Sequence, residues 1–148
     1  MSAFLSLADA VVAALLAAPA VATGYVERNR WRPMPAERNV EVLVHLERAS
    51  GEAASISSGP IDWDTVLRIE CQARPTTGLD AEHSVDALLA TVFTRLSAAS
   101  LITAGVMDLA LLPEIEWDYS DAEQLTVCAT LTLRARQRTQ PDTLTAWS

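Results

Sequence analysis

The sequence predicts an α+β domain: a mainly antiparallel sheet of about four strands, with two amphipathic helices packed on one face. Three observations lead to this prediction. Several segments alternate apolar and polar residues, two others carry apolar residues at helical spacing, and the order is helix, two strands, helix, two strands. This order contains no repeated strand–helix–strand unit, so an antiparallel sheet is favoured. The strongest pattern, over residues 106–138, predicts a long β-hairpin.

The second arm of this hairpin alternates along its whole length, as a half-buried strand does. One of its faces is apolar and comprises Leu125, Val127, Ala129, Leu131, Leu133 and Ala135. The opposite face is polar and ends in Arg134, Arg136 and Arg138. The first arm carries an acidic row on one face, made of Glu114, Glu116 and Asp118.

The first half of the chain predicts one helix and two strands. Residues 2–18 form the helix, with Ser2 as its cap and Pro19 as its stop. Its predicted apolar stripe comprises Phe4, Leu5, Ala8, Val11, Val12, Leu15 and Leu16. Residues 39–48 and 61–73 form the strands, and the Ser-rich segment 49–60 between them predicts a flexible connection.

The second helix is predicted over residues 80–98. Asp80 is a favourable N-cap, and acidic residues in the first turn suit the positive end of the helix dipole. Its apolar stripe, which we expect to cover the sheet, comprises Val85, Leu88, Leu89, Val92, Phe93 and Leu96. The length suits a single domain over residues 1–138, followed by a loose tail over residues 139–148 with Trp147 as an anchor.

The charge balance excludes two classes of function. The net charge is -8, the pI is near 4.6, and all 11 cations are arginines. A protein that binds nucleic acid by neutralising phosphates, or a membrane surface through a polybasic patch, needs the opposite sign. No basic residue precedes the apolar run 2–18, and Asp9 interrupts it. We therefore expect this run to form an ordinary helix of a protein synthesised in the cytosol, and neither a secretory signal nor a membrane span.

The residues that usually carry chemistry are few and scattered. His45 and His83 show no zinc-ligand spacing, and neither Cys71 nor Cys128 lies in a nucleophile motif. The chain has five glycines, too sparse for a phosphate-binding loop. The acidic row fits a solvated face or partner steering better than a glycosidase-like carboxylate pair. We therefore expect no catalytic residue, metal or cofactor, and a protein that is not an enzyme.

Two charged features predict protein contacts. The segment 28–38 contains Arg28, Arg30, Trp31 and Arg32 followed by two prolines, so it predicts an extended loop or edge. Basic and aromatic residues together are typical of nucleic-acid sites, but the overall acidity favours a protein partner, for which Trp and Arg are frequent hot spots.

The second feature is the offset between the arginine row and the acidic row of the hairpin. A tight turn about Asp121 would place Glu116 near Thr126, which leaves the arginine row free to meet acidic residues of another copy. An edge strand protected by charge explains the same row, and both interpretations stay open.

The order of these segments resembles the tail terminator, or minor tail protein U, family of long-tailed bacteriophages and prophages. The features that carry the resemblance cover nearly the whole chain as a pattern. They are the N-terminal helix, the Arg- and Pro-containing segment before NVEVLVHLE, the entry DWDTVLRIECQARP, the helix DAEHSVDALLATVFTRL and the hairpin with WDYSDAEQLTVCATLTLRAR.

This resemblance implies a hexameric ring without catalytic chemistry. The ring caps the finished tail tube, stops its elongation and offers a surface for head joining, so the implied partners are the tail-tube protein and a head-completion or connector protein. The implied location is the head-proximal end of the virion tail, with assembly in the host cytoplasm. The long 49–60 segment and the Ala-rich first helix depart from the pattern and leave open a head–tail connector or tail-completion protein. An enzyme of unknown type and a stand-alone binding module are the alternatives from other classes.

Overall fold

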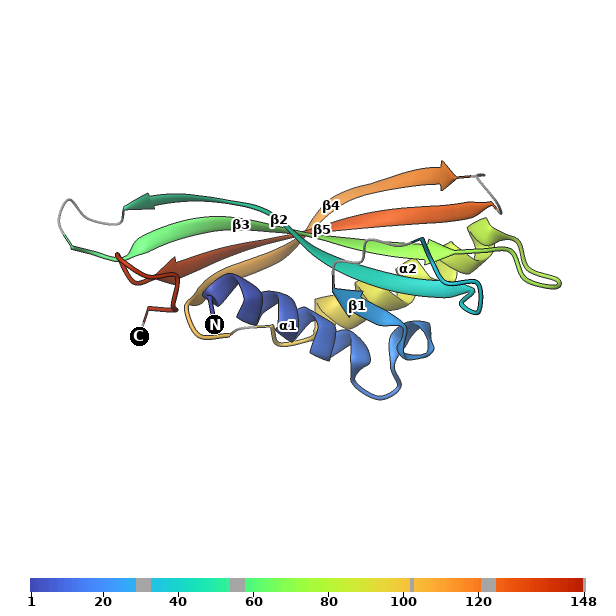
Figure 1. Cartoon of the computed structure of the whole chain (residues 1–148), viewed down its shortest axis with the longest axis horizontal. Helices are drawn as coiled ribbons and strands as arrows, with labels where there is room; N and C mark the ends of the chain where they lie inside the picture. The colour runs from blue at the N-terminus through green and yellow to red at the C-terminus, as the bar shows by residue number, and fades with distance from the viewer. Residues whose placement is uncertain (29–32, 54–57, 102, 121–124, 148) are drawn as a thin grey trace.

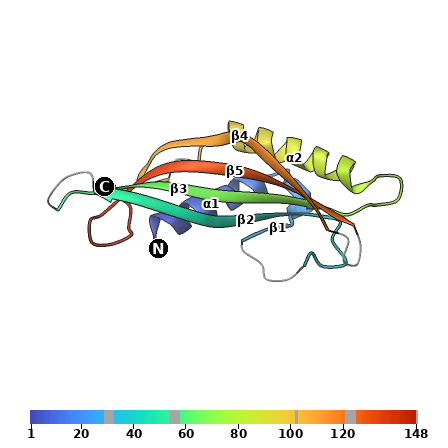
Figure 2. The same cartoon turned by 90° about the horizontal axis from the view of Figure 1, so that it is seen from above.

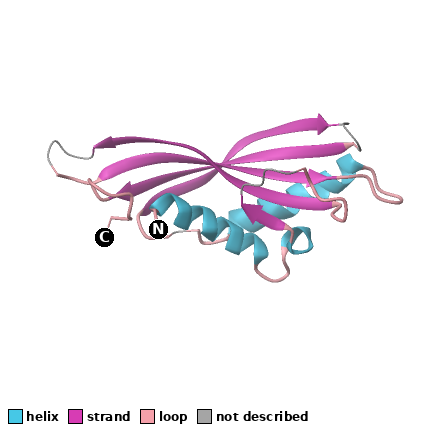
Figure 3. Cartoon of the chain, in the orientation of Figure 1, coloured by secondary structure: helices cyan, strands magenta, loops and turns pink. Residues whose placement is uncertain are grey.

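The computed structural model describes residues 1–28, 33–53, 58–101, 103–120 and 125–147 and shows an α+β fold. A five-stranded, strongly twisted sheet carries both helices on one face (Figures 1 and 3). The strand order is β1-β2-β3-β5-β4, and only the β1–β2 pair is parallel. The elements are α1 (Ala3–Leu16), the 3-10 turn η1 (Val21–Gly24), β1 (Val26–Arg28), β2 (Val40–Ala53), β3 (Ile61–Ala73), α2 (Ala81–Ala98), β4 (Val106–Ser120) and β5 (Thr126–Thr139).

The fold class, the mainly antiparallel sheet and the helices on one face agree with the sequence prediction. The number of strands differs, because the short β1 adds a fifth strand at the edge beside β2. It pairs only with Val42, Leu43 and Val44, so its contribution to the sheet is small.

The pairing of β3 with β5 forms the centre of the sheet and of the core. Their inward-facing residues meet as Leu67 with Leu133 and Ile69 with Leu131, and all four are fully buried. The alternation predicted for both strands is therefore confirmed. The helix-covered face supplies the apolar packing that drives folding.

Helix α1 begins as predicted, since the Ser2 hydroxyl accepts a hydrogen bond from the Leu5 N–H. Its buried stripe is rotated from the predicted one, and Leu5 and Leu16 are exposed. The buried residues are Ala3, Leu7, Ala8, Val11 and Leu15. Apolar residues surround most of this helix, so their spacing alone did not identify the buried side.

Helix α2 agrees closely with its prediction. The Asp80 side chain accepts the hydrogen bond of the His83 N–H at the first turn, and the predicted stripe is buried except for Phe93. Arg95 joins the two helices by donating hydrogen bonds to three carbonyl oxygens at the end of α1, those of Ala14, Ala17 and Pro19. The last carbonyls of a helix lack internal partners, so this guanidinium satisfies groups that would otherwise need water.

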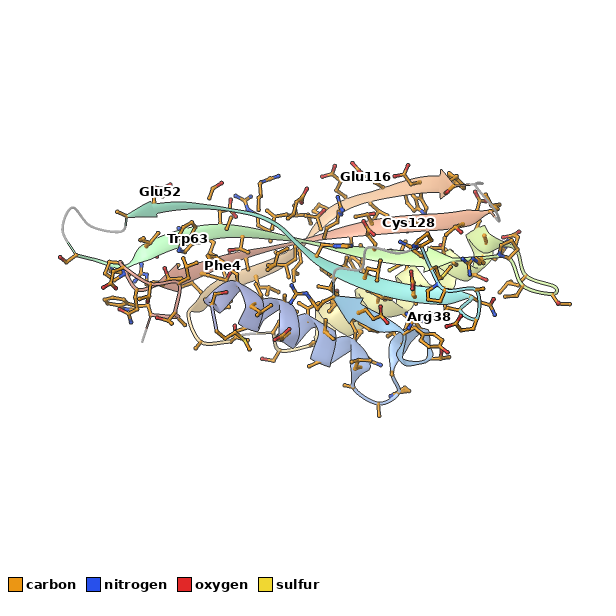
Figure 4. The ribbon with its side chains drawn as sticks, viewed as in Figure 1. Phe4, Arg38, Glu52, Trp63, Glu116 and Cys128 are labelled. Carbon is orange, nitrogen blue, oxygen red and sulfur yellow. The ribbon has the colours of Figure 1, made fainter. Side chains whose placement is uncertain are left out.

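Strands β2 and β3 form a long hairpin, and β5 pairs with β3 along its whole length (Figure 1). We call the outer part of this hairpin, residues 48–53 of β2 and 61–66 of β3, the arm. The prediction that residues 49–60 form a flexible connection is wrong for its first part, because β2 continues through Ala53. Trp63 explains the extension. Its ring lies edge-on to Phe4 of α1 at 5.3 Å between centroids, and its Nε1 donates a hydrogen bond to Thr139 Oγ1 (Figure 4). Gly51, paired opposite Trp63, leaves room for the ring.

The β4–β5 hairpin is confirmed, but its register is wrong in the sequence prediction. Glu116 pairs opposite Thr130, four positions further along β5 than Thr126. The arms close at Ser120 and Thr126, so the connection is longer than the tight turn about Asp121 that the prediction assumed; residues 121–124 lie outside the described part of the chain.

The C-terminal segment, expected to be a loose tail, folds back along the end of the sheet in its described part. Ala146 pairs with Thr139, the Trp147 N–H donates a hydrogen bond to the Arg138 carbonyl, and the Leu144 carbonyl accepts one from the Ala3 N–H. These bonds bring both ends of the chain close together (Figure 1).

Gly51 provides a test of the arm. A Cβ at this position would approach the Trp63 ring to 2.7 Å, and the ring is held by Phe4 and Thr139. We expect Gly51→Ala to lower the free energy of unfolding by about 1–3 kcal/mol, as overpacking typically does. Chemical denaturation measures the change, and the exposed neighbour Ser50→Ala is the control. A Gly51→Ala protein as stable as Ser50→Ala would contradict the packing described.

Candidate interaction surface

Figure 2 views the molecule from the side of the sheet opposite the helices. This face carries charged and polar side chains (Figure 4). A shallow hollow of about 380 Å³ lies on this face and spans four strands. Its charged lining residues are Glu47, Arg48, Asp64, Arg68, Glu114, Glu116 and Arg134. The acidic row of β4 and the arginine row of β5 therefore lie on the predicted, helix-free face.

The prediction that the whole arginine row is free to meet another copy is wrong for two of its members. Arg134 binds both carboxylate oxygens of Asp64, with Nε–Oδ1 at 2.7 Å. Arg138 binds both oxygens of Asp62, at 2.6 and 3.0 Å. The cause is the β3–β5 register, which brings two acidic residues of β3 beside β5. Bidentate pairs of this kind are the strongest geometry for a guanidinium and a carboxylate.

The acidic row differs from Arg134 and Arg138 in its ion pairing. In the described part of the chain, no basic side chain lies within ion-pair distance of Glu114, Glu116 or Asp118. Arg136 and Arg48 are cations without an ion pair under the same criterion. The two rows are offset as expected, since Arg134 lies opposite Ala110 at the other end of β4.

The Arg- and Pro-containing segment before β2 is partly internal. Arg28 pairs with Asp9 at 3.3 Å, whereas Arg30, Trp31 and Arg32 lie outside the described residues. The described end of the segment is fixed by two arginines. Arg38 pairs with Glu27 at 2.7 Å and with Glu41 at 3.4 Å, and it stacks over the Tyr25 ring.

Arg74, the second of these arginines, donates hydrogen bonds to the carbonyls of Met34, Pro35 and Arg38. The loop therefore covers one end of the helix-free face and explains why Glu41 is buried there. The sequence pattern did not predict these contacts, which link residues 36 to 40 positions apart.

An exposed apolar row between α2 and β4 was not singled out by the sequence patterns. Strand β4 is at the edge of the sheet. On the helix-covered side it places Trp117 and Tyr119 beside the first turns of α2 and Met107 beside the end of α2, where the helix covers them only in part. With Phe93 of α2, these large side chains are 41–57% exposed. The Tyr119 hydroxyl donates a 2.6 Å hydrogen bond to Glu82, and this hydrogen bond raises the pKa of Tyr119. The signal available in the sequence was Trp117 and Tyr119 alternating with the acidic row.

Strand β4 also presents an open edge. Its outer side pairs with no strand in the part of the chain that the structure describes. Pro113 lies within a bulge between Leu111 and Ile115 that interrupts the middle of the strand. Edge strands and bulges are the positions of a sheet at which proline is tolerated. The regular stretch from Ile115 to Ser120 carries unpaired acids on one side and exposed aromatics on the other.

The two histidines each lie beside one acidic residue. No group of three or more His, Cys, Asp or Glu side chains among them is arranged to hold a metal ion. None of the helices in the described ranges is long and apolar enough to cross a membrane. His45 lies 3.3 Å from Glu70, and His83 pairs with Asp80 in the first turn of α2, which raises the pKa of His83.

The Asp64–Arg134 ion pair predicts a pH dependence of stability. Hydrogen bonding from Arg134 lowers the pKa of Asp64, so the pair stabilises the fold above the ordinary carboxyl pKa and is lost as the pH falls through the lowered value. A double-mutant cycle with Asp64→Asn and Arg134→Gln should give a favourable coupling near pH 7 that weakens as the pH falls towards 2. The matched cycle with Arg136→Gln, a neighbouring arginine without the ion pair, should give a smaller coupling near pH 7.

The two thiols provide a second test. Burial raises the pKa of Cys71 to about 12, and burial with nearby Glu70 raises the pKa of Cys128 to about 11. Thiolate is the reactive form, so we expect both cysteines to react slowly with a thiol reagent near pH 8 in the folded protein and rapidly in denaturant. Fast labelling of Cys128 in the folded state would mean that its strand face is more open than described.

Comparisons of the whole chain with known proteins give a similar solved structure but no family. No family model and no curated protein matches the chain. Among solved structures, the chain is similar to a chain from the virion of a native gene transfer agent particle, with 21% sequence identity, 93% of this chain and 92% of that chain covered, and a TM-score of 0.49. A likeness at this identity and TM-score decides neither the fold nor the function of the present chain.

Proposed function

We propose that this chain is a structural protein of a phage-like virion, a tail terminator that assembles head to tail into a hexameric ring. The ring caps the tail tube, stops its elongation and presents a surface for head joining. Its partners are further copies of the chain, the tail-tube protein and a head-completion or connector protein. It acts without catalysis, and its place is the head-proximal end of the tail.

The observation that carries this proposal is the presence of two unlike open edges on one sheet. The β4 edge has the acidic row, two exposed aromatic rings and no basic residue, whereas the β2 edge has Arg48, without an ion pair among the described residues, between Glu47 and Glu52. A closed ring needs a heterologous interface, in which two different patches of one subunit meet. A cation on one edge that can face the acids of the other favours that arrangement over a pairing of two acidic β4 edges.

The sequence resemblance supports the more specific role. The order of helix, Arg- and Pro-containing segment, strand pair, helix and hairpin on which it rests is also the order of elements in the fold. The charged, helix-free face suits contact with other virion proteins better than catalysis, since its residues form ion pairs and no enclosed site.

Assembly of the purified chain tests the proposal. Native mass spectrometry and electron microscopy, without and with tail-tube protein, should show rings of six copies and tubes that stop growing once capped. A chain that stays monomeric and never binds tube subunits would contradict the proposal. A ring that binds filled heads but never tails would identify a connector instead.

Charge reversal tests the acidic edge. Asp118 has no ion-pair partner in the described chain, so Asp118→Arg should leave the fold intact and weaken ring formation by about tenfold or more. Asp142→Arg, on the C-terminal segment, makes the same charge change away from β4 and is the control. Equal assembly of the two variants, measured by light scattering after size-exclusion chromatography, would remove β4 from the interface.

A further inference from the structure

The edge of β2 is open along most of the arm. The short β1 covers only Val42 to Val44, and beyond them the same edge pairs with no described strand up to Ala53. The other side of β2 stays paired with β3 over this whole stretch. Among the described residues, the outer side of β2 beyond Val44 and the outer side of β4 are therefore both unpaired, and both have backbone groups available for another chain.

The directions of these two strands match a head-to-tail copy. Three antiparallel steps separate β2 from β4, so the two strands run in opposite directions. A second copy that continues the sheet in the same sense brings its β2 beside the first copy's β4 in antiparallel orientation. Antiparallel pairing is the more stable arrangement per residue, and it needs no change in either subunit.

The side chains of the two edges are complementary. On the helix-covered side, Phe4, Leu46, Ala49 and Thr65 line a hollow of about 210 Å³ beneath the β2 edge. Ala49, Gly51 and Ala53 pair opposite inward-facing residues of β3, so only small side chains stand on this side of the open edge. The β4 edge carries a large side chain on its corresponding side, where Trp117 lies beside the first turns of α2 and is 50% exposed.

The polar sides of the edges match as well. Arg48 lies on the helix-free face of β2, and Asp118 lies on the helix-free face of β4 opposite Cys128. An antiparallel pairing that places Trp117 against Ala49 brings Asp118 beside Arg48. Each of these two charges would then gain the partner it lacks within its own chain.

We propose that β4 of one copy adds to the open edge of β2 in the next copy as an antiparallel strand, with Trp117 seated in the hollow beside Phe4 and Asp118 beside Arg48. This inference rests on the proposed ring and specifies how its subunits join. Strand addition to an exposed edge takes affinity from main-chain hydrogen bonds and specificity from alternate side chains. The pairing continues one sheet from subunit to subunit.

The hydrogen bond from the Val42 N–H to the Tyr25 carbonyl identifies which backbone groups face the open edge. Alternate residues of β2 share this orientation, and the bulge between Leu46 and Arg48 shifts it by one position. The outward N–H groups on the arm are therefore those of Ala49, Gly51 and Ala53. A proline at Ala49 removes one outward donor without removing a hydrogen bond to β3.

The test compares Ala49→Pro with Ala49→Ser, which keeps the donor, and Trp117→Ala with Met107→Ala, an apolar control on the other half of β4. Unfolding midpoints establish that each variant folds. We expect Ala49→Pro and Trp117→Ala to raise the dissociation constant of the ring by at least about tenfold, and the two controls to change it by less than about threefold. Ala49→Pro rings as tight as the wild type would overturn the strand pairing and leave the ring itself standing. A wild-type chain that forms no ring with tube protein would overturn the proposed function instead.

Crosslinking measures directly which edges of neighbouring copies meet. The double variant Arg48→Cys with Asp118→Cys places one new thiol on β2 and the other on β4, and strands β3 and β5 lie between them. A bismaleimide should give a ladder of covalent oligomers up to the ring size, because the native thiols of Cys71 and Cys128 are held in their unreactive form by raised pKa values. A ladder supports the head-to-tail pairing. Dimers formed by Asp118→Cys alone, without a ladder from the double variant, would indicate that two β4 edges meet and would overturn it.

Discussion

The pairing of β3 with β5 is the constraint on which the rest of the structure depends. It aligns thirteen consecutive positions between strands that are separated by a helix and an entire further strand in the sequence. On one side this register makes the core, where Leu67, Ile69, Leu131 and Leu133 are fully buried. On the other side it brings Asp62 and Asp64 to Arg138 and Arg134. A shift of β5 by one residue would turn its core side chains to the other face and separate both of these ion pairs, so both faces specify the same register.

The ion pairs determine which charges of the protein are neutralised within the chain. A net charge of -8 destabilises a compact chain by self-repulsion. The described arginines are concentrated where they offset this repulsion: Arg134 and Arg138 on β3 carboxylates, Arg38 on Glu27 and Glu41, and Arg28 on Asp9. Four of the described acids without an ion pair, Asp108, Glu114, Glu116 and Asp118, lie on β4 at the edge of the sheet. Their charge is located where a neighbouring molecule can approach.

Local sequence patterns correctly predicted features that are determined within a single strand or helix. The alternation in β5 was sufficient because one face of that strand is entirely buried, and the Asp80 cap was sufficient to place the start of α2. The patterns failed where long-range contacts decide. Helix α1 is apolar on almost every side, so only its packing against the sheet selects the buried side. The hairpin register depends on a connection that is longer than the assumed turn. The outer part of β2 is ordered by Trp63, which contacts α1 and β5. The pairing of arginines with β3 acids follows from a register that no single segment encodes.

The number of long strands in the sheet decides which assembly its edges favour. An antiparallel sheet with an even number of strands ends in strands of opposite direction, and β2, β3, β5 and β4 make four. Two copies related by a two-fold axis would place β4 against β4, which sets acidic rows of like charge side by side at a cost in free energy. A rotation that repeats in one sense places β4 against β2, where acids meet Arg48 and aromatic rings meet a strand of small residues. The same charge that keeps two β4 edges apart therefore selects the heterologous contact, and a heterologous contact that closes on itself is a ring.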